Sequence, residues 1–360
     1  MTQYMLISAS ALVIVIGIMP LVKKAAVRWG FMDQPSERKI HVSPTPRLGG
    51  AAIYLGCIAA LLVFSKHFYI SQLVSILVGA TLVSFLGVWD DHHSLRPLFK
   101  LLGQMVAAGV LIVSGIQVGF LHNPVLNLAA TLLWVVGITN ALNLLDNMDG
   151  LSGGVATVAS AFFFLLAVMS GQYLVASLAA ALLGACIGFL YYNFNPASIF
   201  MGDTGSLFIG FVLAALGIKL RFPDNVRHVT WMVPILVLGV PLFDATMVFL
   251  SRYRRGVRLM QGGVDHSSHR LVRLGFGKLG AGLALDLVGV GLGMTAVFIM
   301  QANIAEGYAV GLMVAAIAVY ALWKLEWQLS HEMRVGKVPG KAHRGGVEDQ
   351  PDPSLPGNVK

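Results

Sequence analysis

The chain has 360 residues, of which 56% are hydrophobic and only 12% charged, and its formal net charge is +8. A soluble domain carries about 25% charged residues, so half that share over this length excludes a soluble enzyme, and the apolar excess excludes a disordered or collagen-like chain. A helix needs about 20 apolar residues to cross the hydrocarbon core of a membrane. Eleven stretches come close to that length, and the sequence therefore predicts an all-α, polytopic membrane protein. They lie near 4–22, 49–65, 70–89, 100–118, 127–145, 152–170, 172–192, 205–220, 230–250, 279–300 and 306–323.

Basic residues are divided unequally between the two sets of loops that eleven spans would create. Of the 25 Lys and Arg, 21 fall on one side, and we expect that side to be cytoplasmic because cytoplasmic loops are enriched in basic residues. The amino terminus is then outside and the carboxyl terminus inside. Topology and anionic headgroups account for the positive charge without a nucleic-acid partner. We expect residues 1–338 to form the membrane domain with its cytoplasmic loops, and the Pro- and Gly-rich segment 339–360 to be a disordered cytoplasmic tail.

Carboxylates gather at the cytoplasmic ends of the predicted spans, where ionisable groups are functional candidates by default. The first acidic element is the pair Asp90–Asp91, followed by Lys100 at the start of the next span. Adjacent carboxylates repel each other unless a cation or proton lies between them, so the pair favours a metal or phosphate site over a solvated turn. Asp244 lies about two turns inside the ninth predicted span. Asp286 lies within the tenth span and has no evident role.

The second acidic element is NALNLLDNMDGLSGG, which closes the fifth predicted span. Asn140, Asn143 and Asp146 follow one another at a three-residue step and share one face of a helix. Asp149 comes where the helix is expected to end. Amide and carboxylate oxygens on one face suit Mg²⁺ and a polar ligand, whereas a helix cap would need one such residue and not four.

Two further elements follow. In NFNPASIFMGDTGS, Asn195 precedes a proline and Asp203 opens the next span, where it is either part of a phosphate or metal site or a simple N-cap. In DHSSHRL, His266 and His269 lie close to Arg270. The two histidines have the spacing of a zinc pair, but neither a cysteine nor a third histidine lies within reach, so contact with phosphate is favoured.

Together these elements resemble one family, the polyprenyl-phosphate N-acetylhexosamine-1-phosphate transferases (glycosyltransferase family 4), whose superfamily includes phospho-N-acetylmuramoyl-pentapeptide transferase. The matching segments run in the family's order over roughly residues 33–275. They read DQPSERKIHVSPTPRLGG, WDDHHSLRPLFK, NALNLLDNMDGL, NFNPASIFMGDTGS and DHSSHRL. Each segment alone is weak, but five in order on eleven spans are highly specific.

The resemblance implies that sugar-1-phosphate passes from a UDP-amino sugar, with UDP-GlcNAc preferred, to undecaprenyl phosphate, and that UMP is released. It implies Mg²⁺, with Mn²⁺ as an alternative, and a bacterial inner-membrane enzyme whose site faces the cytoplasm. The product would start a cell-envelope polysaccharide, and a homodimer is left open. The expected catalytic residues are Asp90, Asp91, Asp149, His266 and His269; the expected metal ligands are Asn143, Asp203 and Asp91. The expected substrate-binding residues are Lys100, Asn140, Asp146, Asn195, Phe200 and Arg270, with Phe200 at the position that can stack on uracil.

Two positions depart from the family's pattern. The middle histidine of its H-x-H-H motif is Ser268 here, and the glycine expected after Asp146 is Asn147. Both departures favour the GlcNAc branch over the muramoyl-pentapeptide branch, although UDP-MurNAc-pentapeptide and other UDP-amino sugars remain alternatives. Asp90 would orient or deprotonate the lipid phosphate, or form a covalent aspartyl-phosphate. Outside this family, the alternatives are an ion-coupled secondary transporter and an inactive lipid-binding relative.

Overall fold

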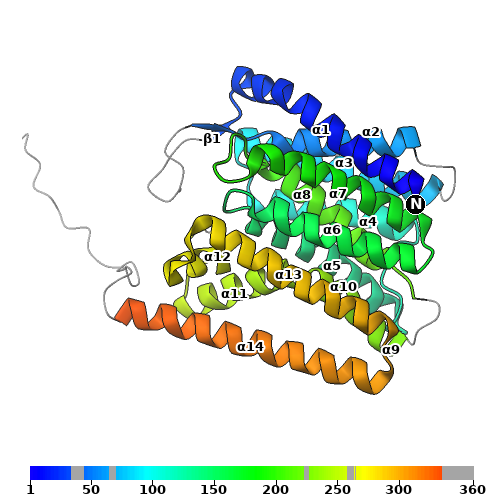
Figure 1. Cartoon of the computed structure of the whole chain (residues 1–360), viewed down its shortest axis with the longest axis vertical. Coiled ribbons are helices and arrows are strands. Elements are labelled where there is room, and N and C mark those ends of the chain that lie inside the picture. Colours follow the sequence, from blue (N-terminus) through cyan, green and yellow to red (C-terminus); the bar gives the residue numbers. More distant parts are fainter. Residues whose placement is uncertain (34–43, 65–69, 223–226, 258–262, 264, 335–360) are drawn as a thin grey trace, which may run out of the picture.

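The computed structural model describes residues 1–33, 44–64, 70–222, 227–257, 263 and 265–334, and the predicted tail 339–360 lies outside them (Figure 1). The described chain is a bundle of helices with one small strand pair. The elements are α1 Thr2–Trp29, β1 Met32–Asp33, β2 Thr45–Pro46, α2 Gly49–Phe64, α3 Ile70–His93, α4 Pro97–Val113, α5 Pro124–Leu145, α6 Leu151–Met169, α7 Tyr173–Asn193, α8 Gly202–Lys219, α9 Arg227–Thr230, α10 Met232–Val237, α11 Gly239–Arg255, α12 Ser267–Leu271, η1 Val272–Phe276, α13 Gly277–Gln301 and α14 Ile304–Arg334.

Every predicted apolar stretch coincides with helix, so the all-α, polytopic membrane architecture is confirmed. Among the described residues, eight helices are long and apolar enough to cross a membrane. The stretch 230–250 is not one straight helix, because His228–Val237 and Gly239–Arg255 meet at 76° and would make a ninth, broken span. Two shorter apolar helices, α2 and α4, occupy the second and fourth predicted stretches. The number of crossings and the orientation of the termini stay predictions.

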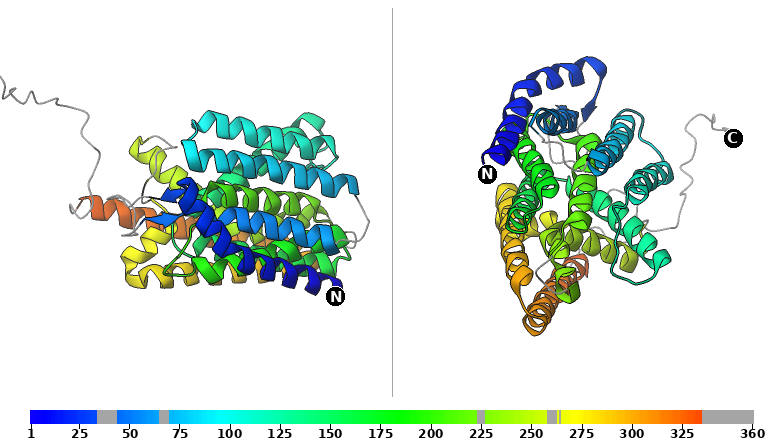
Figure 2. Two further views of the ribbon diagram at one scale, coloured as in Figure 1. Left: turned by 90° about the horizontal axis from the view of Figure 1, so that it is seen from above. Right: turned by 90° about the vertical axis from the view of Figure 1, so that its right-hand side faces the viewer.

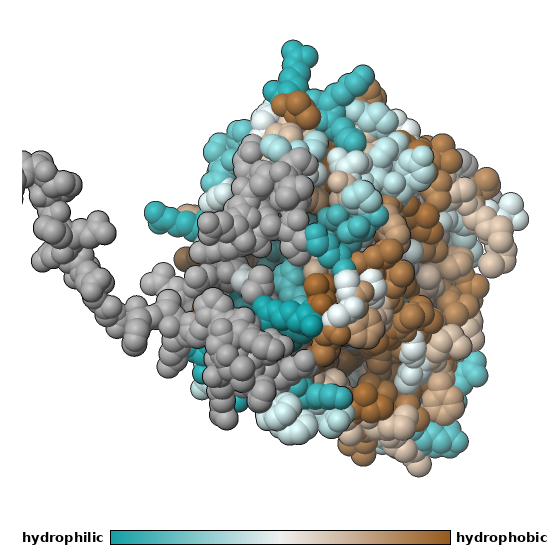
Figure 3. All heavy atoms as spheres, turned by 60° about the vertical axis from the view of Figure 1, so that its left-hand side comes forward, coloured by the Kyte–Doolittle hydropathy of each residue, from teal (hydrophilic) through white to brown (hydrophobic). Residues whose placement is uncertain are grey.

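The helices run side by side around α8 (Figure 2). Of the residues of α8, 83% are buried, whereas the apolar window of α14 is 0% buried. Large apolar side chains cover the outside instead: Val113, Leu133 and Leu312 are 91%, 77% and 70% exposed. Brown apolar atoms cover much of the visible face in Figure 3, and teal polar atoms gather towards the end beside the grey segments. Such a surface is stable against lipid and costly in water.

The ends of α3 and α5 meet the start of α8 at one end of the bundle. A short backbone connection lies beside them: β1 pairs antiparallel with β2, and the N–H of Phe200 donates to the carbonyl of Pro46 at 2.8 Å. The carbonyl of Phe200 in turn accepts the N–H of Gly49 at 2.9 Å. These bonds hold the segment before α8 against the segment before α2.

Cysteine labelling tests whether the short helix α4 crosses the membrane. Ser94 and Gln117 are exposed and flank α4, whereas the native Cys57 and Cys186 are both buried. A membrane-impermeant thiol reagent applied to intact cells should label Gln117→Cys, and it should reach Ser94→Cys only after the membrane is opened. The unsubstituted chain gives the background. Equal labelling of both variants in intact cells would contradict the predicted crossing.

Candidate functional site

Four side chains from four helices converge at the start of α8. Lys100 of α4 places its Nζ between two carboxylates, 2.9 Å from Oδ2 of Asp90 and in contact with Oδ2 of Asp203. Asn143 of α5 donates from Nδ2 to Oδ1 of Asp203 at 3.0 Å. The structure thus joins the three sequence elements in which Asp90, Asn143 and Asp203 were expected to act. A cationic group already lies between the two acids, which is the arrangement that two neighbouring carboxylates require.

The second acid of the pair, Asp91, has a different position. Its carboxylate accepts the backbone N–H groups of Asp203 and Thr204, each at 3.0 Å, and the hydroxyl of Thr204 at 2.8 Å. Arg47 lies beside it, with Nη2 3.1 Å from Oδ1 of Asp91. Asp91 is therefore an N-cap supplied to α8 by α3, and its charge faces the positive end of the α8 dipole.

This arrangement decides whether Asp203 is the N-cap of α8, but it does not decide the chemical role of Asp91. Asp203 is the second residue of α8 and follows Met201 at the N-cap, so its own side chain is not the cap. The side chain of Asp91 is only 1% exposed, and both of its oxygens are engaged with the protein. Its predicted catalytic and metal-ligand roles stay predictions.

Two glycines permit the close approach of α3 and α8. Gly202 has φ +71°, and a Cβ there would lie 2.7 Å from Oδ2 of Asp91. A Cβ on Gly87 would lie 2.5 Å from backbone atoms of Asp203. Both distances are shorter than any comfortable carbon contact, so a larger residue at either position would displace the start of α8.

The loop between α5 and α6 is tied to the segment before α8. The side chain of Asn193 accepts the N–H of Gly150 at 2.9 Å, and Oδ2 of Asp149 accepts the N–H of Ala197 at 3.0 Å. In this segment Asn193 makes an anchoring bond, and the predicted substrate-binding role of the nearby Asn195 stays a prediction. Asp149 also anchors this contact. Its predicted catalytic role stays a prediction.

Negative charge accumulates around this loop. The pKa of Asp146, which follows the end of α5, is raised to about 8, first by desolvation and then by the charges of three neighbouring carboxylates, Asp203, Asp91 and Asp149. Burying like charges near one another is unfavourable, and a bound cation would relieve it.

Sequence reasoning missed two residues that support the site. Gln104, which is buried, exchanges hydrogen bonds with Asn140 at 2.5 and 3.3 Å. It lies four residues after Lys100 and thus on the same face of α4, a spacing that could have revealed it. Arg47 was part of a quoted motif but was not singled out. In the sequence, a single basic residue in a loop is explained by the enrichment of such residues in cytoplasmic loops. Only the structure shows that Arg47 pairs with the carboxylate of Asp91.

The histidine element forms the short helix α12, close to the same loop. The rings of His266 and His269 are in contact, with centroids 5.8 Å apart. The hydroxyl of Ser268 donates to Oδ1 of Asn147 at 2.7 Å, so the two positions that depart from the family's pattern touch each other. Arg270 is buried and directs its guanidinium to Glu326 of α14 at 2.9 Å. Its predicted contact with substrate therefore stays a prediction.

Asp286 lies away from the four-residue cluster. Its carboxylate is packed against Gly154 of α6, where an added Cβ would lie 2.6 Å from Oδ2. Oδ1 is buried and makes no hydrogen bond to the part of the chain that the structure describes. The geometry gives this residue a place but no chemical task.

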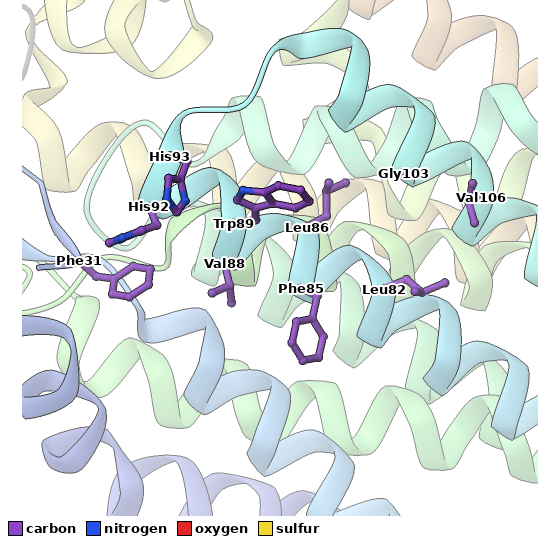
Figure 4. Close-up of a pocket in the computed structure, with 10 residues that line it drawn as sticks. All are labelled: Phe31, Leu82, Phe85, Leu86, Val88, Trp89, His92, His93, Gly103 and Val106. Atoms are coloured by element: carbon purple, nitrogen blue, oxygen red, sulfur yellow. The ribbon is translucent and has the colours of Figure 1, made fainter. Parts of the chain in front are cut away.

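An apolar groove of about 570 Å³ lies between α3 and α4 (Figure 4). Phe85 and Trp89 line it along α3, and Gly103 and Val106 line it along α4. His92 and His93 lie at the end of α3, beside the groove (Figure 4). The groove is apolar enough to hold hydrocarbon.

A membrane-spanning helical bundle with carboxylates, amides and a lysine gathered at one end is the architecture of a polytopic membrane enzyme that handles charged groups at the bilayer surface. Residues 73–221 match the model of glycosyl transferase family 4. The chain is 35% identical over 303 residues to a probable undecaprenyl-phosphate N-acetylglucosaminyl 1-phosphate transferase of Bacillus subtilis, covering 82% of this chain and 84% of the relative. It is 32% identical over 290 residues to a decaprenyl-phosphate N-acetylglucosaminephosphotransferase of Mycobacterium tuberculosis, covering 71% and 72%.

A phospho-N-acetylmuramoyl-pentapeptide-transferase of Bacillus cytotoxicus is 33% identical over 224 residues, covering 56% of this chain and 69% of the relative. The chain belongs to glycosyl transferase family 4, so the family predicted from the five segments is confirmed and the protein is a transferase. The transporter alternative is thereby set aside.

A pair of alanine substitutions tests the close packing of α3 on α8. Gly87→Ala should destabilise the protein by about 1–3 kcal/mol, because the new methyl group meets the backbone of Asp203. The matched control is Gly109→Ala on α4, where nothing lies within 4 Å of the new carbon. The control should be neutral or stabilising by up to about 1 kcal/mol. Thermal unfolding of the purified protein in detergent measures both, and equal midpoints would count against the packing described.

Proposed function

We propose that this protein transfers N-acetylglucosamine-1-phosphate from UDP-GlcNAc to undecaprenyl phosphate at the cytoplasmic face of the bacterial inner membrane. An oxygen of the lipid phosphate attacks the sugar-bearing phosphorus of the donor, the bond from that phosphorus to the bridging oxygen breaks, and UMP leaves. The product would begin a cell-envelope polysaccharide. The observation that carries the proposal is the cluster of Asp90, Lys100, Asn143 and Asp203 at one end of the bundle. An apolar groove runs along α3 and α4, the helices that carry Asp90 and Lys100.

The donor set suits Mg²⁺, with Mn²⁺ as an alternative. Carboxylate and amide oxygens are hard ligands of the kind that Mg²⁺ prefers. In the described part of the chain, no group of three His, Cys, Asp or Glu side chains forms a complete cage. Mg²⁺ is commonly held by one or two carboxylates together with substrate phosphates. Asp203 and Asn143 would be the protein's share once Lys100 leaves Oδ2 of Asp203, which it contacts in this structure. Bound there, the ion would supply positive charge to the pyrophosphate of the donor.

The remaining residues of the cluster position the reacting groups. Lys100 offers a second positive charge between the anions, and its contacts with Asp90 and Asp203 hold it where donor and acceptor meet. Asp90 also accepts the N–H of Leu95 at 2.7 Å, which fixes its carboxylate. The second pKa of a phosphate monoester is near 6, so the acceptor needs little help to lose its proton. Asp90 therefore orients the lipid phosphate, and direct displacement needs no aspartyl-phosphate.

The groove between α3 and α4 supports a lipid acceptor. Trp89, His92 and His93 line it at the end of α3 that also carries Asp90, so the phosphate of a prenyl chain in the groove would lie at the same end of the bundle as the acidic cluster. The exposed apolar face of α3 lets such a chain enter sideways from the bilayer.

Two observations support GlcNAc as the sugar. The two relatives named for N-acetylglucosamine cover 82% and 71% of this chain, whereas the muramoyl-pentapeptide relative covers 56% of it. Asn147 and Ser268 stand where the family pattern has a glycine and a histidine. Their hydrogen bond joins the loop after α5 to α12, so the two departures occur together at one contact.

Transfer is measured with purified protein, labelled UDP-GlcNAc, undecaprenyl phosphate and Mg²⁺. Labelled lipid and UMP should appear in equal amounts. UDP-GalNAc and UDP-MurNAc-pentapeptide, offered separately, should give at most about a tenth of that rate, because losing well-made contacts to the correct sugar lowers the rate by roughly tenfold or more. A faster reaction with either one would replace the proposed donor, and release of UMP without labelled lipid would contradict transfer.

The metal proposal is tested through Asp203. Asp203→Asn keeps the volume but removes one charge, so the Mg²⁺ concentration for half-maximal rate should rise and the maximal rate should fall by about 100-fold or more. A fluorescence titration of Mg²⁺ binding in the presence of UMP provides a reading that does not depend on turnover. Glu306→Gln, at an exposed acid in the first turn of α14, is the control. An unchanged Mg²⁺ requirement in Asp203→Asn would remove this residue from the ligands.

A further inference from the structure

Asp244, an acid to which the proposed mechanism gives no task, lies on α11 with its side chain 0% exposed. One oxygen, Oδ2, lies 2.8 Å from Nδ1 of His266. The other, Oδ1, accepts the backbone N–H of Ser267 at 2.7 Å and its hydroxyl at 2.6 Å. Both oxygens are therefore directed to the first residues of the histidine element.

The contact to Nδ1 fixes the imidazole in two respects. An ionised carboxylate can only accept hydrogen bonds, so Nδ1 of His266 carries the proton that faces Asp244. The bond also stops rotation of the ring and leaves Nε2 as the nitrogen available to another partner.

The other contacts of α12 cannot perform this task. Ser268 binds Asn147 and Arg270 binds Glu326, so both fasten the helix without touching the ring of His266. His269 contacts that ring edge to face. Asp244 alone, among the contacts described for His266, fixes the orientation of the imidazole by a hydrogen bond.

We infer that Asp244 is a positioning residue, which holds the ring of His266 and the start of α12 so that Nε2 is directed to the pyrophosphate of the nucleotide-sugar donor. The inference rests on the proposed function for the identity of the donor. It assigns to α11 a part in the site although that helix contributes no group to the acidic cluster.

A double-mutant cycle separates this role from general stability. Asp244→Asn and His266→Ala should each lower turnover at saturating substrates by about 30-fold or more. Turnover of the double variant should lie within about threefold of the turnover of the less active single variant, because residues that act as one unit have non-additive effects. Ser267→Ala is the matched control: it removes a bond to Oδ1 of Asp244 and leaves the contact to His266. It should keep at least about half of the turnover.

A second measurement does not depend on transfer. Diethyl pyrocarbonate modifies free imidazole, and the modified peptide can be quantified by mass spectrometry. His266, which is buried and bonded to Asp244, should react at least about five times faster in Asp244→Ala than in the unsubstituted protein. In Ser267→Ala its rate should be unchanged.

The outcomes distinguish the two proposals. If the unsubstituted protein makes labelled lipid and Asp244→Asn keeps most of that rate, the inference fails and the function stands. Losses that multiply in the double variant would also overturn it, since Asp244 would then act independently of His266. If the unsubstituted protein transfers nothing, the proposed function fails. The modification rates then decide the inference, and equal rates in Asp244→Ala and the unsubstituted protein would overturn it.

Discussion

The start of α8 depends on a carboxylate that comes from another helix. The first backbone N–H groups of a helix have no partner within it, and in the interior of a membrane protein water cannot supply one. Asp91 of α3 satisfies the N–H groups of Asp203 and Thr204, and Arg47 compensates its charge. These bonds fix the backbone that carries Asp203, so the contacts of Asp203 with Lys100 and Asn143 follow from them.

Asp244 forms the same kind of contact with α12. In both places a buried acid on one helix accepts backbone N–H and hydroxyl hydrogen bonds from the start of another: Asp91 accepts two N–H groups and one hydroxyl, and Asp244 accepts one of each. Helices α3 and α11 thereby fix the starts of α8 and α12. Asp203 and His266 lie at these two starts, so their orientation depends on the two buried acids. This explains how a site assembled from several loops and helix ends keeps its geometry at the edge of a bilayer.

The sequence predicts the helices and the cluster well, because apolar length and the position of acids at span ends are local properties. It cannot distinguish Asp90 from Asp91, since neighbouring residues on a helix point about 100° apart and only packing decides which one faces α8. Nor does it reveal Arg47, Gln104 or the partner of Asp244, which depend on contacts between distant segments. The bend between α10 and α11 did have a local signal that was not used, because Gly239 and Pro241 lie where α11 begins and a proline cannot continue a preceding helix.

The burial of α8 limits how such an enzyme can diversify. Its first turn is confined by Gly87 and by the carboxylate of Asp91, so almost any enlargement there disturbs Asp203 and its contacts with Lys100 and Asn143. The contact of Asn147 with Ser268, by contrast, joins a loop to the short helix α12 and does not involve the first turn of α8. Paired replacements can accumulate at that contact without moving α8. Under the proposed function, relatives with different sugar donors can therefore differ at this contact while the start of α8 keeps its geometry.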